Sequence, residues 1–239
     1  MAAADYIVVA KQVISLLNAQ AVTTAYPTSA TDIGDDRRNA DEIKEAVVES
    51  DLEARLAICE TPGNGFRNLF IDSASPVLLL NVPQAGRLPE RVGPVSRVEI
   101  KVNAADTVWI AGEQCPLNEV QEMIANPDAY QNTAHDAINS PLGGYYYIDE
   151  MSDFITWTGN AVRVYVATLG TIDRTTPLLR TPDAYSPFLV ARSLARLYKH
   201  GDNSAFIEWY DRQARELMAM IRLGARVLPQ VEPLIRQAA

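Results

Sequence analysis

The stretch that decides the fold is "GYYYIDEMSDFITWTGNAVRVYVA", residues 144–167, which has the pattern of three short strands. Its aromatic and β-branched runs are separated by Gly, Asn and Asp, a composition typical of strands joined by turns. In the last run, valines alternate with Arg163 and Tyr165, so this strand has one apolar face and one mixed face. The stretch therefore predicts three short strands joined by turns.

Its three tyrosines raise the question of a base-stacking platform. In a strand, Tyr145 and Tyr147 would point to one side and Tyr146 to the other, so the three rings cannot form one flat surface. Nearby acidic residues, including Asp149 and Asp153, would also repel phosphates. We expect the tyrosines to pack within a sheet or to contact another protein.

The strand pattern extends over about 76–170, through runs such as "PVLLLNVP" and "SRVEIKVN", and is interrupted only by a predicted short helix at Leu117–Ile124. Helical spacing precedes this region, at Ala4–Gln20 and at Asp36–Cys59. The second of these helices carries apolar residues on two opposite sides. It is either the central helix of a bundle or a helix that packs against its own subunit and a neighbour.

Helices return after the strand region. "FLVARSLARLYKH" and "DNSAFIEWYDRQARELMAMIR" are joined at "GDN" and predict a helical hairpin. The last stretch, Leu223–Ala239, has two prolines and alternating apolar residues, which predict an extended arm. The fold class is therefore α+β, a helical bundle with an inserted antiparallel β-rich lobe. The expected divisions are N-terminal helices at 1–70, the lobe at 76–170, the hairpin at 177–222 and the arm at 223–239.

Composition excludes several classes of function. The 239 residues carry a formal net charge of −9, which disfavours a protein that grips phosphates, since that affinity comes from Lys and Arg. No run approaches the length of a membrane span, so we expect no membrane partner. The two cysteines, Cys59 and Cys115, lack metal-ligand spacing and are expected as buried free thiols.

Motifs for catalysis or cofactor binding are not found in the sequence. It contains no G-x-S-x-G, H-E-x-x-H or P-loop pattern, and only two histidines. His200 falls where a cation suits the end of a helix, and His135 falls in a polar loop. We expect no enzyme activity, no catalytic residue, no metal and no cofactor.

The order of elements resembles a known family. "GYYYIDEMSDFITWT...AVRVYVA" and the closing "PDAYSPFLVARSLARLYKHGDNSAFIEWYDRQAREL" are similar to the head-to-tail adaptor (connector) proteins of tailed bacteriophages, the group that includes the tail tubular proteins A of podophages. The first of these stretches resembles a meander of three strands in that family, and the resemblance implies that residues 144–167 form one meander. "DRRNADEIKEAVVESDLEARLAI" and "SRVEIKVN...CPLNEVQEMI" resemble the early helices and middle strands of the same family. The likeness covers most of the chain and rests on patterning; the Pro-containing tail departs from it.

The resemblance implies a structural protein of the virion neck, assembled in the host cytoplasm. It implies a ring of about twelve copies that joins the portal to the tail or nozzle protein and continues the channel for double-stranded DNA. Twelve copies would carry roughly −100 charge, so DNA would pass without specific binding. The alternatives are another neck or tail ring component, such as a tail terminator, nozzle or tail-completion protein, and an enzyme with an unrecognised site.

The resemblance also assigns expected contact residues. The arm would contact the portal through its apolar side chains, and the two-sided helix would contact neighbouring subunits. The tyrosine strand would face the tail or a neighbour. The portal candidates are Val227, Leu228, Val231, Leu234 and Ile235; the inter-subunit candidates are Val48, Leu52 and Leu56; the remaining candidates are Tyr145, Tyr146 and Tyr147.

Overall fold

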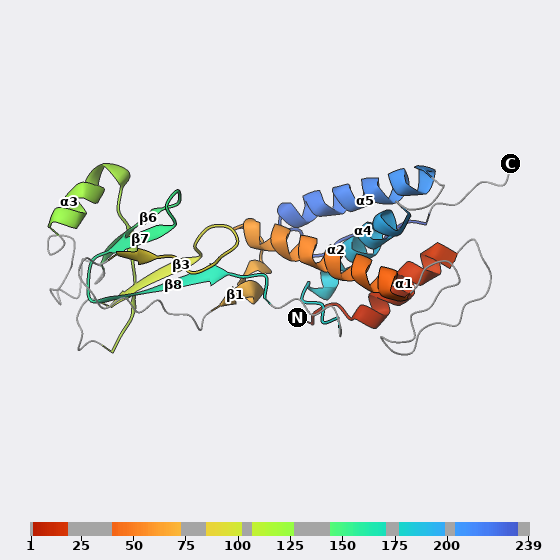
Figure 1. The fold of residues 1–239 in the computed structure, drawn as a ribbon, viewed down its shortest axis with the longest axis horizontal. Coiled ribbons are helices and arrows are strands. Elements are labelled where there is room, and N and C mark those ends of the chain that lie inside the picture. Colours follow the sequence, from red (N-terminus) through yellow and green to blue (C-terminus); the bar gives the residue numbers. More distant parts are fainter. Residues whose placement is uncertain are drawn as a thin grey trace. The chain divides into compact units, whose positions relative to one another are not determined.

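The protein divides into two compact units, each with its own core (Figure 1). Met1–Phe70 and Leu169–Ala239 form the first, the helical unit, and Ile71–Thr168 forms the second, the β lobe. The class is α+β. The computed structural model describes residues 2–18, 40–72, 85–101, 107–126, 144–170, 177–198 and 204–233.

Among the described residues, four long helices form the helical unit. Helix α1 begins after Asp5, whose carboxylate accepts a hydrogen bond from the Ile7 amide at 2.7 Å. The helices predicted from Ala4, from Asp36 and at the hairpin are confirmed. Parts of these predicted helices lie outside the described residues, namely 19–20, 36–39 and 199–203, the last of which includes His200. The bounds are α1 Tyr6–Asn18, α2 Ala40–Glu60, α4 Ser186–Tyr198 and α5 Ser204–Arg222, with 3-10 turns η1 Arg67–Phe70 and η4 Asp183–Tyr185.

Helix α4 occupies the centre of this unit. It contacts α1, α2 and α5. Its side chains from Phe188 to Ala191 are all buried. Of the two helices, α4 rather than α2 is therefore the central one. The reason is composition: α2 keeps Glu42, Glu45 and Glu60 on an exposed face, whereas α4 has apolar or small residues on nearly every side.

The β lobe contains two four-stranded sheets. One sheet has the order β1-β8-β3-β4, and the other has the order β2-β7-β6-β5. A 3-10 turn and a short helix follow β5, so the helix predicted at Leu117–Ile124 is confirmed. The bounds are β1 Ile71–Asp72, β2 Ala85–Arg87, β3 Arg97–Lys101, β4 Ile110–Ala111, β5 Glu113–Gln114, η2 Leu117–Glu119, α3 Val120–Ala125, β6 Tyr145–Asp149, β7 Phe154–Trp157 and β8 Ala161–Ala167.

The two sheets share one hydrophobic core. Ile155 and Trp157 of β7 meet Val98 and Ile100 of β3, together with the valines of β8. Alternation explains this arrangement, because every second residue of each strand faces inward. The strand run predicted at 76–83 lies outside the described residues.

Two predictions about strand pairing are wrong. Strands β6 and β7 pair, but β8 joins the other sheet, so residues 144–167 do not form one meander. The chain leaves β7 at Thr158–Asn160, where Gly159 has a φ of 93°, and β8 then packs face to face on β7 because both have apolar inward faces. The lobe is not wholly antiparallel either, since β5 pairs with β6 in parallel after a connection that contains α3.

Candidate interaction surfaces

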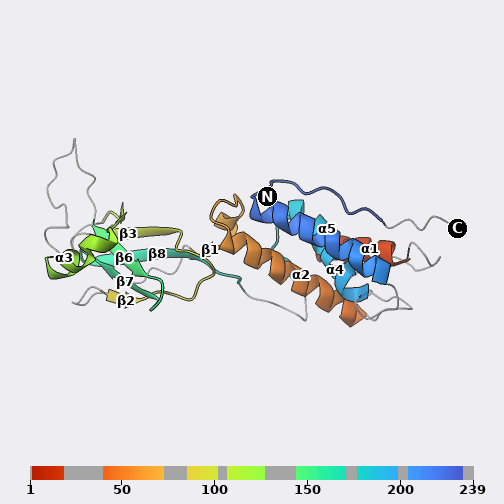
Figure 2. The ribbon, with the colours of Figure 1, turned by 90° about the horizontal axis from the view of Figure 1, so that it is seen from above.

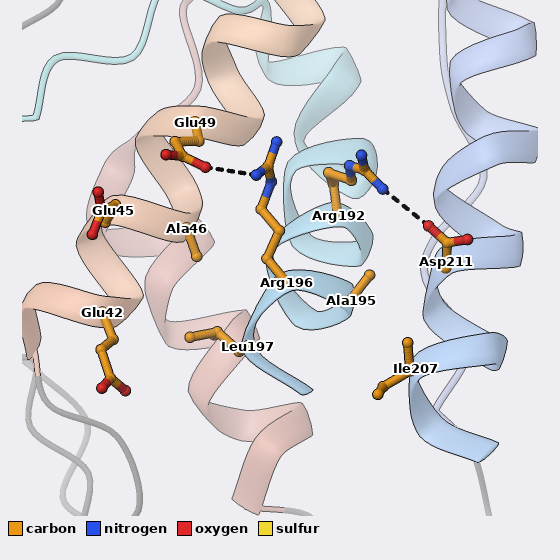
Figure 3. Close-up of a pocket in the computed structure, with 10 residues that line it drawn as sticks. All are labelled: Glu42, Glu45, Ala46, Glu49, Arg192, Ala195, Arg196, Leu197, Ile207 and Asp211. Atoms are coloured by element: carbon orange, nitrogen blue, oxygen red, sulfur yellow. Dashed lines mark hydrogen bonds and ion pairs between the residues drawn. The ribbon is translucent and has the colours of Figure 1, made fainter. Parts of the chain in front are cut away.

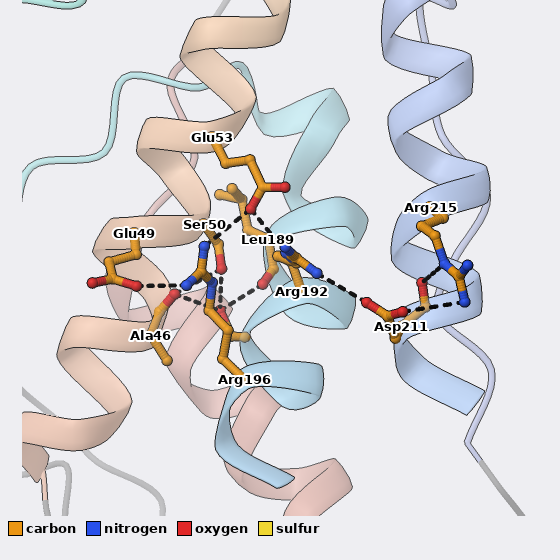
Figure 4. A network of polar contacts seen from close by, with 10 residues as sticks. Ala46, Glu49, Ser50, Glu53, Leu189, Arg192, Arg196, Asp211 and Arg215 are labelled. Atoms are coloured by element: carbon orange, nitrogen blue, oxygen red, sulfur yellow. Dashed lines mark hydrogen bonds and ion pairs between the residues drawn. The ribbon is translucent and has the colours of Figure 1, made fainter. Parts of the chain in front are cut away.

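Two arginines of α4, one helical turn apart, bind carboxylates from both neighbouring helices (Figure 4). Arg192 donates to Glu53 of α2 at 2.8 Å and to Asp211 of α5 at 2.9 Å. Arg196 donates to Glu49 at 2.6 Å and to Glu53 at 3.0 Å. An exposed ion pair alone contributes at most about 1 kcal/mol. The network joins three helices, α2, α4 and α5, through one pair of arginines.

A groove lies beside this network (Figure 3). It is open to solvent, has a volume of about 860 Å³, and its lining comes from α2, α4 and α5. Among the described residues of the lining, the polar side chains are carboxylates and arginines, including Glu42, Glu45 and Arg196. The described part of the groove is therefore lined by side chains of both charges.

A buried ion pair anchors the segment that leads into α4. Asp51 and Arg55 of α2 form a salt bridge with side chains 2% and 3% exposed. Asp51 also accepts the Thr181 amide at 3.0 Å, and Arg55 donates to the carbonyls of Leu169 (3.0 Å) and Leu178 (3.1 Å). The pair thus satisfies backbone groups of a segment without helix or strand.

The two cysteines are free and buried, as predicted. Burial raises the pKa of the Cys59 thiol to about 11, and burial also raises the pKa of Cys115. Both thiols therefore remain protonated at neutral pH. Because only the thiolate is nucleophilic, neither cysteine is a reactive nucleophile. Within the described residues, no group of three or more His, Cys, Asp or Glu side chains is placed to hold a metal ion. His135 lies outside those residues.

The inter-subunit candidates on α2 differ in exposure. Val48 is buried within its own helical unit, Leu52 is half-buried and Leu56 is 39% exposed. Only Leu56 among them presents a largely free apolar side chain on α2.

The first part of the arm folds back along α5, as Figure 2 shows. Gln213 of α5 binds the backbone of Glu232 in both directions, at 3.0 Å as donor and 2.8 Å as acceptor. Trp209 donates its indole N–H to the same Glu232 carbonyl at 2.9 Å. The side-chain amide of Gln213 thus pairs with this stretch as a neighbouring strand would.

The portal candidates on the arm fall into three groups. Leu228 is buried, and its amide donates to the carbonyl of Ala184 at 3.3 Å. Val227 is 71% exposed, and Val231 is half-buried. Leu234 and Ile235 lie outside the described residues.

The tyrosines of β6 divide between two faces as predicted. Tyr145 and Tyr147 pack against Cys115, Val120 and Met123, beneath α3. Tyr146 packs against the core between the sheets. All three are half-buried, so each ring is engaged by the β lobe itself, and no face presents three stacking rings.

Sequence reasoning missed the arginine network and the Gln213 clamp. The network had a readable signal, because Glu49/Glu53 on α2 and Arg192/Arg196 on α4 both repeat at i, i+4 and so share a helix face. The clamp had none, since nothing local to Gln213 indicates that the chain returns to it some twenty residues later.

No helix among the described residues is both long and apolar enough to cross a membrane. No protein-family model matches the chain, and no curated protein matches it either.

Proposed function

We propose that this chain is the subunit of a head-to-tail adaptor ring in the neck of a tailed bacteriophage. In this proposal the helices from the two ends of the chain form one bundle, and the β lobe is inserted between them. The ring, of about twelve copies, joins the portal to the tail or nozzle protein and continues the DNA channel.

One observation carries the proposal. Both ends of the chain lie in one helical unit and the middle forms a separate two-sheet lobe, which is the order of elements found in the sequence resemblance. Such a protein has two separate surfaces to offer to the two neighbours of an adaptor. A tail terminator, the nearest alternative, is expected to be mostly sheet, and the four long helices fit that class less well.

The exposed apolar side chains support contacts at both units. In the helical unit, Leu223 and Val227 are 87% and 71% exposed at the start of the arm. In the β lobe, Met151 is 99% exposed in the turn between β6 and β7, with Phe154 close behind it in sequence. Side chains of this kind anchor protein interfaces when they lie in a patch. We assign the arm to the portal and the β lobe to the tail component.

Co-assembly with the portal protein of the same phage tests the proposal. Val227→Asp should weaken co-purification with portal at least tenfold, because a carboxylate cannot be buried without a partner. Met151→Asp is the matched control, since it also adds a carboxylate at an exposed apolar site but lies in the β lobe. Rings of the wild type on portal should be visible by electron microscopy. Absence of any complex between wild type and portal would refute the proposal.

A further inference from the structure

The outer side of the sheet β1-β8-β3-β4 carries a basic face. Alternation points Val98, Ile100 and the valines of β8 into the core, so the residues between them point outward. The register places Arg97 opposite Tyr165 and Glu99 opposite Arg163. The basic face comprises Arg97, Glu99, Lys101, Trp109, Arg163 and Tyr165.

The one carboxylate of this face, that of Glu99, pairs with other residues of the same face. Glu99 is 5% exposed, pairs with Arg97 and accepts the Tyr165 hydroxyl at 2.7 Å. Arg163 lies over the ring of Trp109, with its guanidinium carbon 4.0 Å from the ring centroid. Lys101 forms no ion pair within the described chain. With three cations and one carboxylate, the face has a formal charge of +2 in a chain of −9.

The opposite side of the β lobe is acidic. The outward residues of β6 share their side with α3, because Tyr145 and Tyr147 pack beneath that helix. Glu113 lies beside Tyr145 in register, and Asp149 has the same parity as the two tyrosines. The acidic face comprises Glu113, Glu119, Glu122 and Asp149, and the register places Arg87 on the same side. The formal charge of these five residues is −3.

The two charged faces point in opposite directions. Between them lie one sheet, the shared core and the second sheet, and α3 lies beyond the second sheet (Figure 1). Opposite charges on opposite sides cannot pair within one copy, but the basic face of one copy can meet the acidic face of the next. A contact of this kind uses two different patches, and it forms a ring when the rotation between successive copies closes on itself.

We propose that β lobes associate head-to-tail, with the basic face of one copy on the acidic face of the next. The inference rests on the proposed ring and names one of its subunit contacts. Nucleic acid is the less suitable occupant of the basic face. Arg163 already covers the ring of Trp109 that a base would stack on, and the net charge of −9 repels a polyanion.

Charge reversal with cross-complementation tests this contact. Arg97→Gln with Lys101→Glu changes the basic face from +2 to −1, and leaves Arg163 on Trp109. Glu113→Lys with Glu122→Lys changes the acidic face from −3 to +1, at two exposed positions. Sedimentation velocity on a concentration series, in buffer of about 20 mM ionic strength, measures self-association where charges are little screened.

The wild type should associate, and each double variant alone should associate at least tenfold more weakly. An equimolar mixture of the two variants should regain association, because each unaltered face then meets its complement. Lys11→Glu with Arg222→Gln is the matched control for the basic-face variant, since it makes the same change of charge on the helical unit. Circular dichroism checks that every variant is folded.

A wild type that stays monomeric throughout the series, or a mixture that does not regain association, would overturn the contact. The contact would also be overturned if the protein does not self-associate but binds duplex DNA tightly, and if the basic-face variant loses that binding. The adaptor function is judged separately. If the charge variants assemble on portal like the wild type, the contact between β lobes is refuted and the adaptor function stands. If the mixed variants regain association but no form of the protein binds portal, the contact stands and the adaptor function is refuted.

Discussion

At the scale of single residues, Asp51 and Arg55 are the most consequential pair in the helical unit. Both side chains are almost fully buried, and together they bind backbone groups at 169 and 178–181. Burying two charges costs free energy of hydration, which their mutual attraction and these hydrogen bonds offset. The pair is therefore a poor candidate for a binding site and a strong candidate for a structural one.

Replacing one partner should show this. Asp51→Asn keeps an acceptor for the Thr181 amide but leaves the Arg55 charge buried without its counterion. We expect the free energy of unfolding, measured by urea denaturation, to fall by about 3 kcal/mol. Asp41→Asn, which also breaks an ion pair of α2 but at an 82% exposed carboxylate, should cost less than about 1 kcal/mol. Equal losses in the two variants would contradict the structural role.

At the scale of elements, α5 has two functions. Its inner side packs on α4, and its outer side binds the arm through Trp209 and Gln213. The arm residues involved have neither helix nor strand, so their backbone groups depend on these side chains. In the proposed adaptor, this clamp holds the arm near Val227 in a defined position before the portal binds.

Removing the clamp should release the arm without unfolding α5. Gln213→Ala deletes both hydrogen bonds to Glu232, so we expect the Glu232 amide to exchange with solvent at least tenfold faster in hydrogen–deuterium exchange. The exchange of α5 amides should not change. Gln12→Ala, an exposed glutamine of α1, is the control. Unchanged exchange at Glu232 would show that Gln213 does not hold the arm.

At the scale of the whole molecule, each of the two compact units buries apolar side chains of its own. Cys59 lies in the core of the helical unit, and Cys115 lies beneath α3 in the β lobe. Each thiol is buried and has a raised pKa, so each reacts slowly until its own surroundings unfold. The two thiols therefore report on the two units separately.

Pulsed alkylation along a urea series, with mass analysis of the two cysteine peptides, should give two different midpoints. Units with separate cores need not unfold together, and a chain of two such units departs from two-state behaviour. Asp51→Asn should lower the midpoint of Cys59 and leave that of Cys115 unchanged. A single midpoint that shifts for both thiols would show that the units unfold as one.

Local patterns are sufficient to predict much of this protein. The period of 3.6 residues places the four long helices, and the period of two separates Tyr145 and Tyr147 from Tyr146. Burial of the two cysteines as free thiols agrees with their lack of metal-ligand spacing. These properties depend on residues that are close together in the chain, so the local sequence is sufficient to predict them.

The choice of partners was decided only by the tertiary structure. Strand β8 has the same alternation whether it pairs beside β7 or packs across the core from it, and α2 and α4 each carry enough apolar surface to be a central helix. The basic and acidic faces, and the Gln213 clamp, likewise join residues that are distant in sequence. The sequence determined which face of each element is apolar, and packing in three dimensions determined what each face meets, because burial energy depends on fit between distant segments rather than on their order.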